Sequence, residues 1–183
     1  MPIDTLRKKW IWLLAVTIVP VGAVAAPQWN FSREASRTMG DLASYAVDAA
    51  LLGDELQAGL GSQELSYQSH AYLLAAIKDD VDAMGAKVCR LEEIKRSLPA
   101  SQRKEIDETL PALSLMANHT GYAIRFLSGH PQELWSPAYA SWVNALTGEA
   151  HQLSHNLGQY IEYAKVHRKD LRLERSLGIS AGK

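Results

Sequence analysis

The chain has 183 residues and a formal net charge of −1, with 19 Lys and Arg residues against 20 Asp and Glu residues. This near-balance argues against nucleic acid as a partner, because proteins that neutralise a phosphate backbone cluster Lys and Arg. The single cysteine, Cys89, excludes an internal disulfide. We expect Cys89 to be a small buried hydrophobic residue on a helix flank, and the alternative is an intermolecular disulfide or a reactive thiol.

A secretory signal peptide is predicted over residues 1–25. Three basic residues at positions 7–9 precede an apolar run from Trp10 to Ala26, and small residues at Ala23 and Ala25 suit cleavage after Ala25. An uncleaved membrane anchor is the alternative, although the run lies at the lower limit of about 17–25 residues for a membrane-spanning helix. We therefore expect an exported protein, periplasmic or secreted, that meets a membrane only through its leader if the leader is uncleaved.

The remaining chain is expected to form one helical domain over residues 26–178, followed by a disordered tail over residues 179–183. The alternating polar and apolar pattern of β-strands does not recur along it. Apolar residues instead repeat at helical spacing in four segments, and short connections that contain Gly or Pro separate these segments.

The first helix is predicted from about Arg33 to Gln57, with Ser32 as its cap and Gly59 and Gly61 at its end. Its apolar positions alternate in steps of three and four residues, which is typical of a helix that packs along one face. Many of them are small, so a neighbouring helix can approach closely. These positions are Ala35, Met39, Leu42, Ala46, Ala49, Gly53 and Leu56.

A second helix is predicted from Gln63 to Leu98, with Ser62 as its cap and Pro99 after its end. His70 shares the apolar stripe of this helix, so we expect a hydrogen-bonded histidine at the edge of the core rather than a ligand-binding one. The stripe consists of Tyr67, His70, Leu74, Ile77, Val81, Met84, Val88 and Leu91.

The third helix is predicted from Ser101 to Ser128, with a kink or break at Pro111, because proline removes a backbone hydrogen bond and clashes with the preceding turn. Its predicted apolar stripe consists of Ile106, Leu110, Leu113, Ala117, Thr120, Ile124 and Leu127.

The fourth helix is predicted to begin with Ser136 as cap and Pro137 as first helical residue, and to fray in the basic stretch 165–175. Its apolar stripe begins with the aromatic segment 134–142, which lies near one end of the helix. We expect these aromatic residues to pack in the core, and the alternative is an aromatic binding patch on the surface. Four amphipathic helices with short connections predict an all-α fold, an up-down-up-down four-helix bundle preceded by a signal peptide.

His151 and His155 are the first candidates for a metal site. They lie four residues apart, so they share one face of the fourth helix and are spaced to chelate a divalent metal. That face is opposite the apolar stripe, and metal sites normally recruit further ligands. Two solvated histidines are therefore the expected interpretation, and a metal site is the alternative.

Met39 and His167 are the candidates for a haem site. Met39 lies about two turns into the first helix and His167 about two turns from the end of the fourth, so an antiparallel bundle places them at one level. A Met/His axial pair there would hold haem b without covalent attachment, as in the b-type cytochrome bundles. His167 belongs to a charged stretch, however, and a core position explains Met39 without haem.

The sequence contains no Gly-x-Ser-x-Gly elbow, Glu-x-x-His pair or His-Glu-x-x-His motif, which are the patterns expected of common hydrolase and metal sites on helices. We therefore expect a non-enzymatic, exported or envelope-associated helical bundle without a cofactor. Its partner would be an unknown protein or a second copy of itself. The alternative is a periplasmic bundle that binds haem or a metal.

Overall fold

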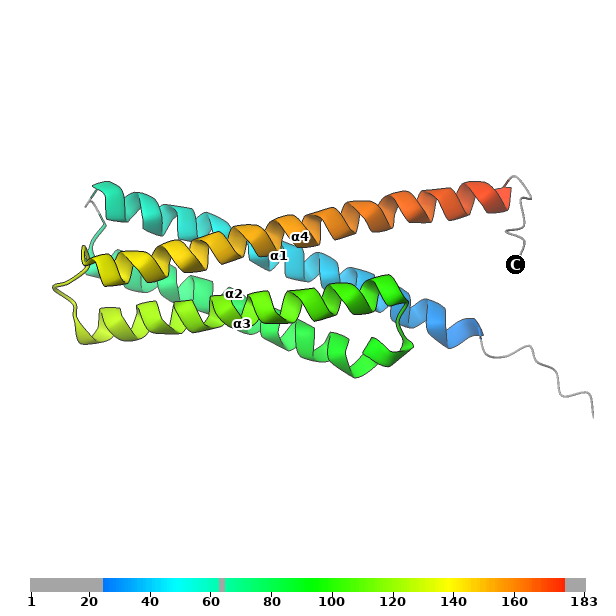
Figure 1. Cartoon of the computed structure of the whole chain (residues 1–183), viewed down its shortest axis with the longest axis horizontal. Coiled ribbons are helices and arrows are strands. Elements are labelled where there is room, and N and C mark those ends of the chain that lie inside the picture. The colour runs from blue at the N-terminus through cyan, green and yellow to red at the C-terminus, as the bar shows by residue number, and fades with distance from the viewer. Residues whose placement is uncertain (1–24, 63–64, 177–183) are drawn as a thin grey trace, which may run out of the picture.

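The computed structural model describes residues 25–62 and 65–176, which form an all-α fold. Four long helices, α1 (Ala25–Ser62), α2 (Tyr67–Ile94), α3 (Ala100–Gly129) and α4 (Pro137–Ser176), follow one another along the chain, and a short 3₁₀ helix, η1 (Lys95–Ser97), extends α2. Each long helix packs chiefly against two others, and α4 closes the bundle against α1 (Figure 1). The predicted up-down-up-down four-helix bundle is confirmed.

Residues 1–24 of the signal peptide predicted over residues 1–25, and the predicted tail over residues 179–183, lie outside the described residues. Within the ranges 25–62 and 65–176, no helix combines the length and the apolar character that a membrane span requires. Figure 1 shows that the start of α1 and the end of α4 extend past the connection between α2 and α3.

All four helices contribute apolar side chains to one core. Leu42, Leu74, Met116 and Leu153, one from each helix, are all almost completely buried. Burying a side chain of this size stabilises the fold by about 1.5–3 kcal/mol, so a core of this kind drives the association of the helices. The stripes predicted for α1 and α2 lie on this core, with Tyr67 half-buried at its edge.

Helices α1 and α4 approach closely at a buried glycine. A Cβ atom added to Gly53 would lie 2.5 Å from Oγ1 of Thr147, which is closer than the atoms can pack. The Thr147 hydroxyl is itself buried and donates a hydrogen bond of 2.8 Å to the carbonyl oxygen of Val143. The small residues predicted on α1 therefore have the expected role, since Gly53 leaves room for the side chain of a facing helix.

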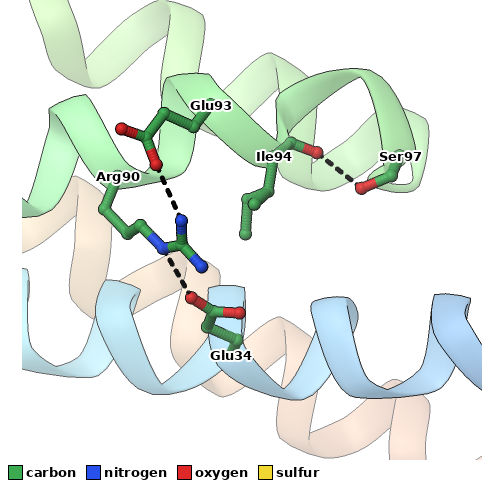
Figure 2. Close-up of polar contacts among 5 residues, drawn as sticks. All are labelled: Glu34, Arg90, Glu93, Ile94 and Ser97. Atoms are coloured by element: carbon green, nitrogen blue, oxygen red, sulfur yellow. Dashed lines mark hydrogen bonds and ion pairs between the residues drawn. The ribbon is translucent and has the colours of Figure 1, made fainter.

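Charged side chains link α1 to α2 outside the core. Figure 2 shows Arg90 of α2 between Glu34 of α1 and Glu93, with donor–acceptor distances of 2.8 Å and 2.7 Å respectively. Lys87 donates to Asp41 of α1 at 2.6 Å. Exposed pairs of this kind contribute about 0–1 kcal/mol each, so they support the register of the two helices more than their stability.

Helix α1 begins at Ala25, earlier than the predicted start near Arg33, so the predicted cap Ser32 lies inside the helix. Pro27 falls in the first turn. Proline is tolerated there, because the first backbone N–H groups of a helix have no helical acceptor.

The prediction for the end of α1 was also wrong. The helix does not end near Gln57 but continues through Gly59 and Gly61 to Ser62. Gly59 is buried, and a Cβ atom on it would lie 2.2 Å from Cδ1 of Leu65. Gly59 therefore makes room for the segment that leads into α2, which is a different role from ending a helix.

Helix α2 begins at Tyr67 rather than at Gln63, and its cap is Ser66 rather than Ser62. The Ser66 hydroxyl accepts a hydrogen bond of 3.2 Å from the backbone N–H of Ser69. This bond satisfies one of the N–H groups that the first turn leaves without an acceptor.

The α-helical part of α2 ends at Ile94, before the predicted Leu98. The chain tightens into η1, where the backbone N–H of Leu98 bonds to the carbonyl oxygen of Lys95 at 3.0 Å. The Ser97 hydroxyl donates to the carbonyl oxygen of Ile94 at 2.6 Å (Figure 2). Pro99 follows, and the residue before a proline is restricted to extended conformations, so the helix cannot continue.

Helix α3 runs through Pro111 without a break, so of the predicted kink or break the break does not occur. Pro111 and Asp107 are both exposed. The carbonyl oxygen of Asp107 loses its helical partner to the proline ring, but water can bind it on the exposed side of the helix.

The buried face of α3 also differs from the predicted stripe. Leu110 and Ala117 are exposed, whereas Thr109 and Met116, one residue earlier in each case, are buried. A shift of one residue rotates a side chain by about 100° around the helix. The predicted stripe was therefore out of register at these two positions.

The predicted start of α4 is confirmed. The helix begins at Pro137, and the Ser136 hydroxyl accepts a hydrogen bond of 3.3 Å from the backbone N–H of Tyr139. The prediction of fraying over residues 165–175 was wrong, since the helix continues to Ser176.

Cys89 is exposed, so the expectation that it is buried was wrong. Its neighbour Val88 lies in the core, and the step of one residue turns Cys89 toward solvent.

We predict that Gly53→Ala lowers the free energy of unfolding by about 1–3 kcal/mol, because the added Cβ atom overpacks the contact with Thr147. Gly148→Ala on α4 is the matched control. A Cβ atom there meets nothing within 4 Å, so the substitution is expected to stabilise the helix by up to about 1 kcal/mol. Urea unfolding followed by circular dichroism measures both, and equal effects of the two substitutions would contradict the close packing of α1 on α4.

Candidate functional site

A continuous series of aromatic and histidine rings runs from the α3–α4 side of the bundle to α2. It starts at His119 on α3 and runs through ring contacts to Trp135, which precedes α4, while His130 is a side branch that contacts Phe126. The centroids of successive rings are 4.7–6.4 Å apart, a range in which aromatic pairs attract one another. We name this set the ring ladder; it consists of His119, Tyr122, Trp142, Phe126, His130, Tyr139, His70 and Trp135.

Helical spacing places most of the ring ladder on two facing helices. Tyr122, Phe126 and His130 are four residues apart at the end of α3, so their side chains share one face. Tyr139 and Trp142 are three residues apart in the first turns of α4. Because α3 and α4 are antiparallel neighbours, the end of one helix lies beside the start of the other, and the two sets of rings meet.

The inner end of the ring ladder is a buried histidine–tyrosine pair. His70 and Tyr139 are both 0% exposed, and Nδ1 of His70 lies 3.0 Å from the Tyr139 hydroxyl. Burial lowers the pKa of His70 below its usual 6.5 and raises the pKa of the Tyr139 hydroxyl. Both groups are therefore neutral at neutral pH, as an apolar surrounding requires.

The second ring nitrogen of His70, Nε2, is buried without a hydrogen-bond partner among the described residues. The ring of Trp135 lies 5.8 Å from that of His70, and the two ring planes are nearly perpendicular at 81°. An edge-to-face contact of this kind is favourable but weaker than a hydrogen bond. His70 was predicted to form hydrogen bonds at the core. Nδ1 forms one, and Nε2 forms none with a described residue.

The outer end of the ring ladder holds an oriented histidine–carboxylate pair. Nδ1 of His119 on α3 donates to both carboxylate oxygens of Glu149 on α4, at 2.9 Å each. Both side chains are partly buried. A carboxylate in this position fixes the orientation of the imidazole and joins the two helices beside Tyr122.

The ring ladder reaches the surface at two places. Tyr122 is 47% exposed and stacks on the half-buried Trp142, and Trp135 is 39% exposed and contacts the buried His70. The guanidinium of Arg125 lies 4.8 Å from the centre of the Tyr122 ring. Exposed Trp and Tyr rings that rest on buried rings beside an Arg resemble the residues that contribute most to protein–protein binding.

His151 and His155, the predicted metal pair, have different hydrogen-bond partners. Nε2 of His151 donates to Asp54 of α1 at 2.8 Å, and His155 accepts a hydrogen bond of 2.9 Å from the amide of Gln159 on its own helix. Within the described part of the chain, no group of three or more His, Cys, Asp or Glu residues is arranged to hold a metal ion.

Met39 and His167, the predicted haem ligands, differ in their surroundings. Met39 is completely enclosed in the core. His167 is exposed on the part of α4 that follows Leu157, and its ring stacks on that of Tyr163 at 6.1 Å with the two planes nearly parallel.

The two interpretations of the aromatic segment 134–142 each apply to part of it. Tyr139 is in the core, as expected, while Trp135 is at the surface, as in the alternative of a binding patch. The contribution of α3 to the ring ladder was missed. The spacing of Tyr122, Phe126 and His130 was the signal for it, because it predicts a row of rings on one face of that helix.

The ring ladder offers apolar contact area, a guanidinium, and hydrogen-bonding groups whose orientation the bundle fixes. Its two buried or partly buried histidine pairs are engaged within the bundle. No protein-family model, curated protein or solved structure matches this chain.

We predict that Tyr139→Phe lowers the free energy of unfolding by about 1–3 kcal/mol, because it leaves both nitrogens of the buried His70 ring without a partner. Tyr72→Phe removes the same hydroxyl from a tyrosine that is 73% exposed, and should change stability by less than about 0.5 kcal/mol. Urea unfolding of the two variants measures the difference, and a neutral Tyr139→Phe would show that the hydrogen bond contributes nothing.

The lowered pKa of His70 also predicts a dependence of stability on pH. The folded state binds the proton more weakly than the unfolded state, so the contribution of His70 is present above its unfolded pKa of about 6.5 and is lost as the pH falls toward the lowered folded pKa. We expect the loss of stability between about pH 7.5 and about pH 5 to be smaller in His70→Leu than in the wild type. The exposed His155→Gln should keep the wild-type dependence, and identical pH profiles for all three proteins would contradict a neutral His70.

Proposed function

We propose that this chain is an exported, non-enzymatic interaction protein that binds a partner protein through the surface part of the ring ladder. This surface part, the aromatic patch, consists of Tyr122, Arg125, Trp135 and Trp142. The observation that carries the proposal is the exposure of Tyr122 on the half-buried Trp142 and of Trp135 on the buried His70. Single exposed aromatic residues are common, whereas several that are held together usually indicate a binding surface.

The charge of the aromatic patch indicates the chemistry of the partner. Arg125 forms no ion pair with a carboxylate of the described residues and lies over the Tyr122 ring instead. By contrast, Lys87 and Arg90 on α2 both pair with carboxylates of α1. A partner that presents an apolar surface bordered by Asp or Glu side chains would complement both the rings and the free guanidinium.

The fixed geometry of the aromatic patch favours binding. Tyr and Trp side chains have two rotatable bonds each and supply a large contact area at a small cost in conformational entropy. Trp142 contacts both Tyr122 and Phe126, so neighbouring rings hold its orientation before a partner arrives. Such preorganisation reduces the entropy that binding has to overcome.

The leader predicted over residues 1–25 supports the proposal of export. Its basic start, its apolar run and its small residues before position 26 are the features of a secretory signal peptide. The compartment that we propose is the periplasm or the exterior of the cell, and a partner on the envelope fits a domain that is released there.

A photo-crosslinking residue at position 122 or 135 of the full chain tests this function in the native cell. We expect each of the two positions to give the same single cross-linked partner, recovered outside the cytoplasm. The control is position 51, because Leu51 is an exposed residue of α1 and should give no discrete product. Trp135→Ala is expected to abolish the cross-link from position 122, since loss of one central aromatic residue typically costs more than about 2 kcal/mol of binding.

Three outcomes would overturn the proposal. Equal products from positions 51, 122 and 135 would indicate random encounters. A cross-link only to a second copy of the chain would replace the partner protein by self-association. Recovery of the product in the cytoplasm would remove the proposed export.

A further inference from the structure

A groove lies at the opposite end of the α3–α4 pair from the ring ladder, between the beginning of α3 and the second half of α4. Its volume is about 340 Å³, which falls at the lower end of the range of small-ligand sites. Its lining combines two carboxylates, two side-chain amides and two phenol rings: Glu105, Glu108, Asn156, Gln159, Tyr160 and Tyr163.

The carboxylates give the groove a negative charge that the described residues compensate only in part. Glu105 is half-buried and forms no ion pair with a described residue, and partial burial, with the neighbouring Glu108, raises the pKa of its carboxyl group. The charge of Lys104 attracts the Glu105 carboxylate, and its ammonium group lies 3.4 Å from Glu108 in an exposed pair. A cation that enters the groove would therefore meet a carboxylate that has lost part of its water.

The other side chains of the groove supply acceptors and ring surface. Gln159 donates its amide N–H to His155, which leaves its carbonyl oxygen as a hydrogen-bond acceptor. Asn156 adds a second amide. Tyr163 is 61% exposed, and one face of its ring stacks on His167, so the other face is open to a ligand.

We propose that this groove binds a primary alkylammonium ion of the short aliphatic diamine class. A primary ammonium group has three N–H donors, which match the carboxylate and amide oxygens of the groove. The positive charge is also attracted to the face of a tyrosine ring, and the alkyl chain can pack against it.

Other cations match the groove less well. Calcium takes six to eight oxygen ligands, and magnesium requires an octahedral shell, whereas no group of three or more His, Cys, Asp or Glu among the described residues could hold a metal ion. A quaternary ammonium ion can use the tyrosine rings, but it has no N–H group to donate to the acceptors of Glu105, Asn156 and Gln159. The combination of acceptors and rings therefore selects for a primary ammonium with an apolar chain.

Isothermal titration of the mature protein with 1,4-diaminobutane tests this site. We expect saturable binding of one ligand per chain, weakened at least about tenfold by Glu105→Gln, the change expected for the loss of one charge-assisted hydrogen bond. Glu55→Gln is the matched control, because Glu55 is an exposed residue of α1 and the substitution removes the same charge. Its affinity should stay within about twofold of the wild type.

Tyrosine variants separate ring contacts from simple charge attraction. Tyr163→Leu should weaken binding by about threefold or more, whereas Tyr163→Phe keeps the ring and should bind as the wild type does. At constant ionic strength, magnesium chloride and tetramethylammonium chloride should not displace the diamine. Displacement by either salt, equal weakening by Glu105→Gln and Glu55→Gln, or the lack of saturable binding would overturn the proposal. Because Glu105 and Tyr163 are at the surface or half-buried, far-UV circular dichroism should show that each variant remains folded.

Discussion

The structure depends on the burial of four apolar stripes against one another. A close contact between two of them is possible because one of the residues is a glycine, which has no side chain. Gly53 on α1 faces Thr147 on α4, and this pair closes the bundle by joining its first helix to its last. The contact is distant in sequence, so its formation has to overcome the entropy of closing a long loop. Helices α2 and α3 complete the bundle, because α2 packs on α1, α3 packs on α4, and the two pack on each other. Surface ion pairs such as Arg90 with Glu34 support the register but are individually too weak to determine it.

Buried polar groups are the second constraint on this core. His70 and Tyr139 form a hydrogen bond with each other, so each has a partner at one atom. Thr120 and Thr147 need no partner from another helix, because each hydroxyl donates to a carbonyl oxygen one turn earlier in its own helix. The difference matters for specificity. A threonine that bonds to its own helix fits many bundle arrangements, whereas the His70–Tyr139 bond forms only if the start of α2 lies beside the start of α4. The pair therefore favours this arrangement over others with a similar apolar core.

The sequence was sufficient to predict the helices, their order and the start of α4, because apolar periodicity and the Ser136–Pro137 pair depend only on local spacing. It was insufficient for the end of α1, which was predicted at Gly59, and for the cap of α2, which was predicted at Ser62. Gly59 makes room for Leu65, and local sequence rules cannot show this contact. The candidate sites were not predicted in full for the same reason, because they also depend on contacts between distant parts of the chain. The aromatic residues of α4 were visible as a cluster, but the row on α3 becomes meaningful only when the antiparallel pairing brings the two sets together. Similarly, Glu105 and Tyr163 lie far apart along the chain, and neither has a motif that links it to the other.

The two candidate sites share one helix pair and carry opposite charges that the described residues leave open. At one end of the α3–α4 pair, Arg125 lies over an exposed ring without a carboxylate partner. At the other end, Glu105 is half-buried and forms no ion pair with a described residue, although the charge of Lys104 attracts its carboxylate. On the α1–α2 side, the cations Lys87 and Arg90 are paired, and burial, together with Asp48 and Asp79, raises the pKa of the Asp80 carboxyl group. No aromatic ring contact accompanies that acidic group in the described structure. A charge without a partner lowers the stability of the fold when no ligand is bound. When a ligand of opposite charge binds beside the oriented rings, the same charge contributes to the binding energy. Under the proposed function, this asymmetry favours the α3–α4 side for binding, with α1 and α2 as its support.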